Sequence, residues 1–282
     1  MSKKRKIISL IIFGVLVIGL VIGIILTGGS GGESEELSST MRDAVLHESN
    51  KVAFFGLEVN PGLIAGYLVT GIILLFALIV RIFVIPHFKE IPGKFQFLLE
   101  TWVGYFSDLG EQNAPKRAGK LGAYLFIAGS YIFVSTVFEL IGVQWVTTEG
   151  LSISLPAPLS DINGAISVGC LSYLFIMAGG IRYNKARGLG KTLKDFSLPI
   201  SMSFRIFGAL LSGALVTELV YSTIKLSFVL PVVIGVLFTL LHALIQAYVL
   251  TMLVAYFYGE VTEPHKKVRK VKKIKEKTQA AA

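Results

Sequence analysis

Long apolar runs constrain this chain more than any other feature of its sequence. Six of them come close to the roughly 20 residues that a helix needs to cross the hydrocarbon core of a bilayer. They occupy residues 7–26, 63–85, 121–143, 162–181, 198–226 and 232–258. Hydrophobic residues make up 53% of the 282 and charged residues only 16%, which excludes an ordinary soluble domain. The pattern predicts an all-α polytopic membrane protein with about six membrane helices.

The distribution of basic residues predicts how these helices are oriented. Of the 27 Lys and Arg residues, 23 fall in four groups, at residues 3–6, 81–120, 182–194 and 266–277. An alternating six-span topology that begins inside puts all four groups in the cytoplasm, together with both chain ends. The basic tail is then expected near anionic lipid, with nucleic-acid binding as the weaker interpretation of a net charge of +9.

Four regions follow along the chain. Residues 1–27 form an N-terminal membrane span, with a signal peptide as the alternative, residues 28–62 an acidic external loop, residues 63–258 the membrane core and residues 259–282 the cytoplasmic tail. Residues 93–110 have apolar side chains at helical spacing, which predicts a helix along the inner membrane surface or an amphipathic connector packed on other helices. Residues 144–160 are expected to be an external loop, with Ser160 or Asp161 capping the next helix.

Arg205 lies inside the fifth apolar run. Placing an arginine near the middle of a membrane helix costs about 3 kcal/mol on insertion scales, so such residues face a partner or a wet cavity. Its guanidinium keeps its proton at every accessible pH. Arg205 is therefore predicted to be a fixed positive charge with a function.

Other polar residues accompany Arg205 in the last two runs. Ser212 is seven residues on and shares its helix face, whereas Glu218 is rotated by roughly 140° and displaced by about 20 Å. His242 and Gln246 are four apart on the next helix and are expected to point the same way. This fits an ion path in which a titratable group and a permanent cation occupy different positions. The alternatives are packing for His242, a helix–helix hydrogen bond for Gln246 and a headgroup-level ion pair for Glu218.

Soluble catalytic motifs are absent from the sequence. It has no phosphate loop, no paired Cys or His metal spacing and no nucleophile elbow. We therefore expect neither an enzyme active site nor a cofactor or metal.

Four motifs resemble subunit a of F-type ATP synthase. The run Pro-Ile-Ser-Met-Ser-Phe-Arg-Ile-Phe-Gly at residues 199–208 is similar to the family signature around its essential arginine, which corresponds to Arg205. Gln246-Ala247-Tyr248 is similar to the Gln-Ala-Phe of the following helix. The Pro-Gly-Lys-x-Gln at residues 92–96, with Glu100, and the Asp-x-Asn at Asp161 and Asn163 complete the resemblance, in the family's order.

The chain departs from the family pattern at three places. Ala209 stands where the family usually has Asn, Ala214 where it has an acid, and Glu139 where many members have Asn. Glu218 lies one turn beyond Ala214 on the same face, so we expect the acid to have moved by a turn.

The resemblance implies a stator subunit in the inner or plasma membrane, with the last two helices forming a long hairpin against a ring of c subunits. It implies two half-channels for H⁺ or Na⁺, separated by Arg205, with Glu218, His242 and Gln246 along the path. Glu139, Asp161, Asn163 and Ser212 are further candidates for the channel lining. The implied partners are the c ring, the b subunit of the peripheral stalk, other synthase subunits and lipid.

Two other classes of protein compete with this interpretation. A stand-alone channel or secondary transporter predicts midplane polar groups in both halves of the chain, whereas the polar membrane residues here lie in the C-terminal half. A membrane scaffold without transport leaves Arg205 unexplained.

Overall fold

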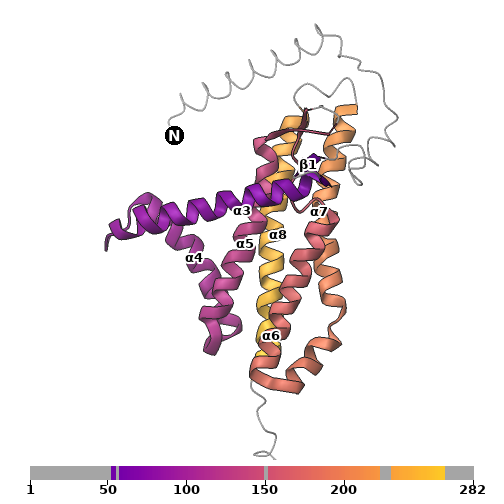
Figure 1. The fold of residues 1–282 in the computed structure, drawn as a ribbon. Helices are drawn as coiled ribbons and strands as arrows, with labels where there is room; N and C mark the ends of the chain where they lie inside the picture. Colours follow the sequence, from indigo (N-terminus) through magenta and orange to yellow (C-terminus); the bar gives the residue numbers. More distant parts are fainter. Residues whose placement is uncertain (1–51, 55–56, 149–151, 223–229, 264–282) are drawn as a thin grey trace, which may run out of the picture.

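The computed structural model describes residues 52–54, 57–148, 152–222 and 230–263 (Figure 1). The principal helices are α3 (Pro61–Ile79), α4 (Lys94–Asn113), α5 (Ala118–Ile141), α6 (Ile162–Lys194), α7 (Ser197–Ser222) and α8 (Leu230–Thr262). A π-helical turn, η1 (Val80–Val84), and a 3-10 turn, η2 (Ile85–His87), extend α3, and η3 (Pro115–Arg117) precedes α5. The expected first span, residues 7–26, lies outside the described residues.

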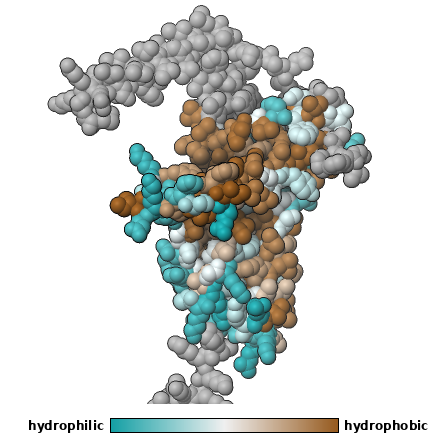
Figure 2. Space-filling model, turned by 60° about the vertical axis from the view of Figure 1, so that its left-hand side comes forward, coloured by the Kyte–Doolittle hydropathy of each residue, from teal (hydrophilic) through white to brown (hydrophobic). Residues whose placement is uncertain are grey.

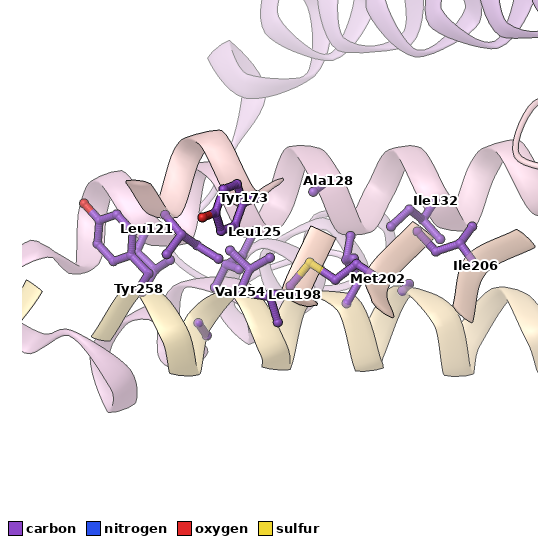
Figure 3. Packing of buried hydrophobic residues seen from close by; sticks show 14 of the residues in the cluster. Leu121, Leu125, Ala128, Ile132, Tyr173, Leu198, Met202, Ile206, Val254 and Tyr258 are labelled. Carbon is purple, nitrogen blue, oxygen red and sulfur yellow. The ribbon is translucent and has the colours of Figure 1, made fainter. Parts of the chain in front are cut away.

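Helices α5, α6, α7 and α8 form the body of the molecule, and α4 packs against α5 (Figure 1). Their core is apolar and continuous from one helix to the next. Figure 3 shows side chains of α5, α7 and α8 meeting in it, with Leu125 and Ile132 fully buried beside Met202, Ile206 and Val254. The helices are held together mainly by this non-directional apolar packing.

Local sequence explains several helix ends. Asn60 caps α3, its side-chain oxygen accepting a hydrogen bond of 2.8 Å from the Gly62 N–H, and Pro61 follows at the first helical position. Gly142 ends α5 with φ of 63°, the left-handed conformation in which glycine is least strained. Asp161 occupies the cap position of α6, as expected, although its side chain makes no capping hydrogen bond.

The chain reverses direction inside α6. Lys185 has φ 52° and ψ −134°, which divides α6 into two helical pieces. The second piece folds back on the first, and Tyr173 of the first piece donates a 3.1 Å hydrogen bond to the carbonyl of Thr192 in the second. A Cβ on Gly188 would collide with the Gly180 backbone, so the two pieces meet at glycines.

Helix α3 leaves the body of the molecule sideways (Figure 1). Only its first half is buried, through Ile64, Ala65 and Val69, which pack with Phe138 and Leu155 in a second, smaller cluster. Most of its remaining apolar side chains are exposed. An apolar helix without a protein covering suits a lipid environment.

The helix expected at residues 93–110 exists as α4, and half of it packs on α5. Trp102 donates a 2.9 Å hydrogen bond from Nε1 to the Ser130 hydroxyl, and Phe106 is buried. Phe95 and Leu98, in the first half, are exposed. The same apolar spacing therefore runs through both halves of α4, but only the second half packs against α5.

Two short antiparallel hairpins add to the helices. β1 (Val52–Phe54) pairs with β2 (Leu57–Val59), and β3 (Gln144–Val146) pairs with β4 (Ser152–Ser154). The second hairpin lies within residues 144–160, which were expected to be an external loop. Pro156 and Pro158 follow β4, where the pairing has ended.

Four of the described helical stretches are long and apolar enough to cross a membrane: Pro61–His87, Pro115–Ile141, Ile162–Lys194 and Gly235–Thr262. Helix α7 occupies the fifth expected span up to its last described residue, Ser222. In Figure 2, hydrophobic surface covers the middle of the molecule, and hydrophilic residues gather at the lower end and at the left-hand tip. The chain is an all-α, multi-pass membrane protein, as its apolar runs predicted.

Candidate functional site

Arg205 lies on the exposed side of α7. Its neighbours Met202, Ser203 and Ile206 are buried, at 1%, 4% and 1% exposure, and pack towards the other helices. A Cβ on Gly169 of α6 would clash with Ser203, which shows how closely α6 covers that opposite side. The helix therefore uses one face for packing and presents Arg205 on the other.

The surface around Arg205 is small and open. Ser201, Gly208 and Ser212 are exposed on the same face, and among the described residues no atom outside the adjacent helix backbone lies within 4 Å of the position that a Cβ on Gly208 would take. The Ser212 hydroxyl donates to the Ala209 carbonyl at 2.8 Å. Within the described residues, no hydrogen bond or ion pair joins Arg205 to another group.

His242 lies on α8 and contacts α7 well away from Arg205. Its Nδ1 is 3.5 Å from the position of a Cβ on Gly213, and its ring is 5.7 Å from that of Phe238. Gly213 is eight residues beyond Arg205, which is about 12 Å along the helix. His242 is therefore next to Gly213 and Ala214, about two helical turns from Arg205.

Gln246 points into the core, unlike His242. It is 5% exposed and belongs to a buried stripe of α8 with Ala243, Leu250 and Val254. Its Oε1 atom is buried without a hydrogen-bond partner among the described residues. A buried acceptor of this kind carries a desolvation cost of about 1–3 kcal/mol unless water or another group satisfies it.

Three further candidates lie where α5 ends and α6 begins. Glu139 is partly buried in the last turn of α5, where its carbonyl accepts from the Gly142 N–H at 3.2 Å. Asp161 packs against the start of α3, with its Cβ 3.1 Å from the position of a Cβ on Gly62. Asn163 is exposed, and its Nδ2 lies 3.5 Å from the Asp161 carboxylate.

The helix pairing brings Glu139 and His242 to one level of the bundle. Arg117 bonds to the Thr262 carbonyl and Gly129 faces Thr251, so α5 and α8 run antiparallel. Ten residues beyond Gly129, Glu139 is therefore level with about residue 241 of α8.

Asn163 reaches the same level by a parallel pairing. Gly179 of α6 faces Tyr258 of α8, and Asn163 precedes Gly179 by as many residues as His242 precedes Tyr258. Glu139, Asn163 and His242 thus define a polar level at one end of the bundle. Glu218 lies on α7 five residues beyond Gly213, and its side chain is outside the described set.

The sequence alone does not single out Gly213, whose role depends on the facing helix. Its only sequence signal is a glycine inside a membrane helix, next to a position where the family pattern is broken. Among the residues that the structure describes, no three His, Cys, Asp or Glu side chains are grouped so as to hold a metal ion.

Comparison with known proteins gives the family of the chain. The model of the ATP synthase A chain family matches residues 65–259, more than half of the chain. A chloroplast ATP synthase subunit a from Stigeoclonium helveticum is 29% identical over 228 residues, covering 74% of this chain and 88% of the relative. The chloroplast ATP synthase subunit a of Oedogonium cardiacum is 29% identical over 223 residues, covering 72% of this chain and 82% of the relative. The chain belongs to the ATP synthase A chain family, as a non-catalytic subunit of the membrane sector of that complex.

Proposed function

We propose that this chain is the stator subunit that passes ions to and from a rotating ring of c subunits. The observation that carries the proposal is Arg205, a permanent cation on an uncovered face of a membrane helix, without a partner among the described residues. A buried or lipid-facing guanidinium is stable only opposite an anion or water. A carboxylate on each passing c subunit supplies that anion.

The charge of Arg205 controls where a c-subunit carboxylate releases its bound ion. It favours the ionised form of an approaching carboxylate, so that the bound ion is released there, and it repels free cations. An ion therefore cannot pass straight between the two half-channels and crosses the membrane only when the ring turns. The exposed small residues Ser201, Gly208 and Ser212 leave room for a ring helix to approach the guanidinium.

The polar level at the far end of the bundle supports a half-channel that opens on the external side. Glu139, Asn163 and His242 come from three different helices, which is the arrangement needed to line a path between them. Glu218 is the acid of this path on α7, and Gln246 lies on α8 between the polar level and the level of Arg205. Each elementary charge moving through 100 mV releases about 2.3 kcal/mol, so several ions drive the synthesis of one nucleotide.

The basic groups of the sequence orient the molecule with its C-terminus in the cytoplasm. The membrane is then the plasma or inner membrane of the cell. Besides the c ring, the partners are the b subunit of the peripheral stalk, other synthase subunits and lipid.

The test is ATP-driven ion pumping by the assembled complex in vesicles, comparing wild type with Arg205→Ala. Arg187→Ala, an exposed arginine on α6, is the matched control. Loss of pumping in Arg205→Ala, with subunit content and ATPase content unchanged, is the expected result. Normal pumping by Arg205→Ala would overturn the assignment. Ion flux through vesicles that contain this chain alone would favour a stand-alone channel instead.

A further inference from the structure

The C-terminal end of α8 is held by side chains of other elements. Four successive backbone carbonyls each accept a hydrogen bond from outside the helix. Lys191 Nζ donates to Glu260 at 3.0 Å, and Arg117 Nη1 donates to Thr262. Asn184 Nδ2 donates to both Val261, at 2.6 Å, and Glu263, at 3.0 Å. We call Arg117, Asn184 and Lys191 the α8 socket.

The chemistry of the socket matches the end of a helix. The last carbonyls of a helix lack partners within it and carry the negative end of its dipole. Two of the three socket residues are cations, whose hydrogen bonds are stronger than those of neutral donors. Arg117 is also fixed from its other side, because its guanidinium stacks 3.8 Å from the centroid of the Tyr183 ring.

The socket connects α8 to the helix that carries Arg205. Asn184 and Lys191 lie on either side of the chain reversal at Lys185, and the second piece of α6 leads almost directly into α7 at Ser197. The bond from Tyr173 to Thr192 and the contact of Gly188 with Gly180 fix that piece. The base of α7 and the end of α8 are therefore joined through one short, bonded segment.

The backbone at Lys185 supports a rigid connection. Its positive φ is disfavoured for a residue with a side chain, and such a conformation persists where the surroundings determine it. Asn184, immediately before it, makes two of the four socket bonds.

We propose that the α8 socket is an anchor that holds α7 and α8 in axial register while the ring pulls on Arg205. This inference rests on the proposed function. The core between the two helices is apolar, and apolar contacts have no donor–acceptor geometry that would by itself set one axial register. If α7 slipped by one residue along α8, Arg205 would move by about 1.5 Å. A misplacement of about 1 Å is enough to weaken the action of a precisely positioned group. Directional bonds at the end of α8 oppose that slip.

The test separates unloaded from loaded rotation. Vesicles with the assembled complex pump ions from ATP, first with a permeant counter-ion that prevents a membrane potential, then without it. Lys191→Met removes a donor while keeping chain length, and Lys191→Arg restores a cationic donor. Lys194→Met, an exposed lysine in the same segment, is the matched control.

We expect Lys191→Met to pump at the control rate without a potential, and to reach a steady potential smaller by roughly twofold. Lys191→Arg should recover the control potential. Asn184→Asp removes the donor of two hydrogen bonds and adds a negative charge beside the carbonyls. Its steady potential should therefore be lower than that of Lys191→Met.

Two results would overturn the anchor. One is a Lys191→Met complex that reaches the same steady potential as Lys194→Met. The other is a Lys191→Met chain that fails to assemble where Lys194→Met assembles, since the contact would then be needed without load. Arg205→Ala measured in parallel keeps the two proposals distinguishable: its normal pumping would contradict the proposed function, whereas its loss with unaffected socket variants would contradict the anchor alone.

Discussion

The imidazole of His242 packs against Gly213 of the facing helix, with Nδ1 3.5 Å from the point where a Cβ on that glycine would stand. The contact brings the imidazole ring of His242 next to Ala214, the position at which the resemblance to subunit a led us to expect an acid. An imidazole is thus present at this place on the facing helix. The absence of a side chain on Gly213 gives the imidazole its space.

Bulk at Gly213 should act through His242. A distance of 3.5 Å is ordinary van der Waals contact, so Gly213→Ala is expected to pump nearly as well as wild type, whereas Gly213→Val should displace the imidazole and slow ATP-driven pumping several-fold. The measurement is the initial pumping rate in vesicles at equal subunit content. In a His242→Ala background the valine should cause little further loss, and an undiminished additional loss would show that it acts elsewhere.

Replacing Gln246 should affect the stability of the chain and its ion pumping in opposite directions. Gln246→Leu removes a buried acceptor that has no partner among the described residues, so the chain should unfold at the same or a higher temperature, with a gain of up to about 1 kcal/mol. Pumping should fall if the amide lies on the ion path.

The matched control is Thr251→Val, on the same helix. The Thr251 hydroxyl is buried and already bonded to the Ala247 carbonyl at 2.7 Å, so its loss should cost about 1 kcal/mol of stability and leave pumping intact. Unchanged pumping by Gln246→Leu would remove Gln246 from the path.

The indole of Trp102 should hold α4 on α5. Trp102→Phe keeps much of the ring contact with Phe106 and loses the hydrogen bond to Ser130. We expect a loss of about 1 kcal/mol in the free energy of unfolding, equal to that of Ser130→Ala. Thermal unfolding of the purified chain in detergent measures both variants and their combination. Fully additive losses in the double variant would show that the two groups are not coupled.

The sequence predicted the elements well because apolar length and helix signals are local. Every expected span inside the described residues is helical, and α4 appears where its amphipathic spacing placed it. The β3–β4 hairpin could not be predicted, since its strands are only three residues long and carry little pattern.

Only part of the candidate site could be predicted from the sequence. Arg205 stands out because a charge in an apolar run is conspicuous by itself. The different surroundings of His242 and Gln246 depend on how α8 rotates against α7 and the core, which a spacing of four residues does not specify. The α8 socket joins residues 69 to 145 positions apart in the chain, and no local pattern connects them.

The reversal of α6 should not tolerate a side chain at Gly188. A Cβ there would overlap the Gly180 carbonyl and Cα, and the backbone cannot move aside as a flexible side chain can. We expect Gly188→Ala to destabilise the chain by about 1–3 kcal/mol. Gly190→Ala is the control, because in the described part of the chain no atom outside the adjacent backbone lies within 4 Å of its Cβ position, and it should stabilise the helix by up to about 1 kcal/mol. Equal unfolding temperatures for the two variants would contradict the close approach.

Lys185 should be one of the few positions where glycine stabilises a helix-rich chain. Its φ of 52° and ψ of −134° strain any residue with a Cβ by about 1–3 kcal/mol, and glycine removes that strain at an entropic cost of about 0.5–1 kcal/mol. Lys185→Gly is therefore expected to raise the free energy of unfolding by about 1 kcal/mol. Lys185→Ala, which also removes the charge but keeps the Cβ, should show no such gain. If both variants shift the unfolding temperature equally, the effect comes from the lost charge and the backbone strain is not its source.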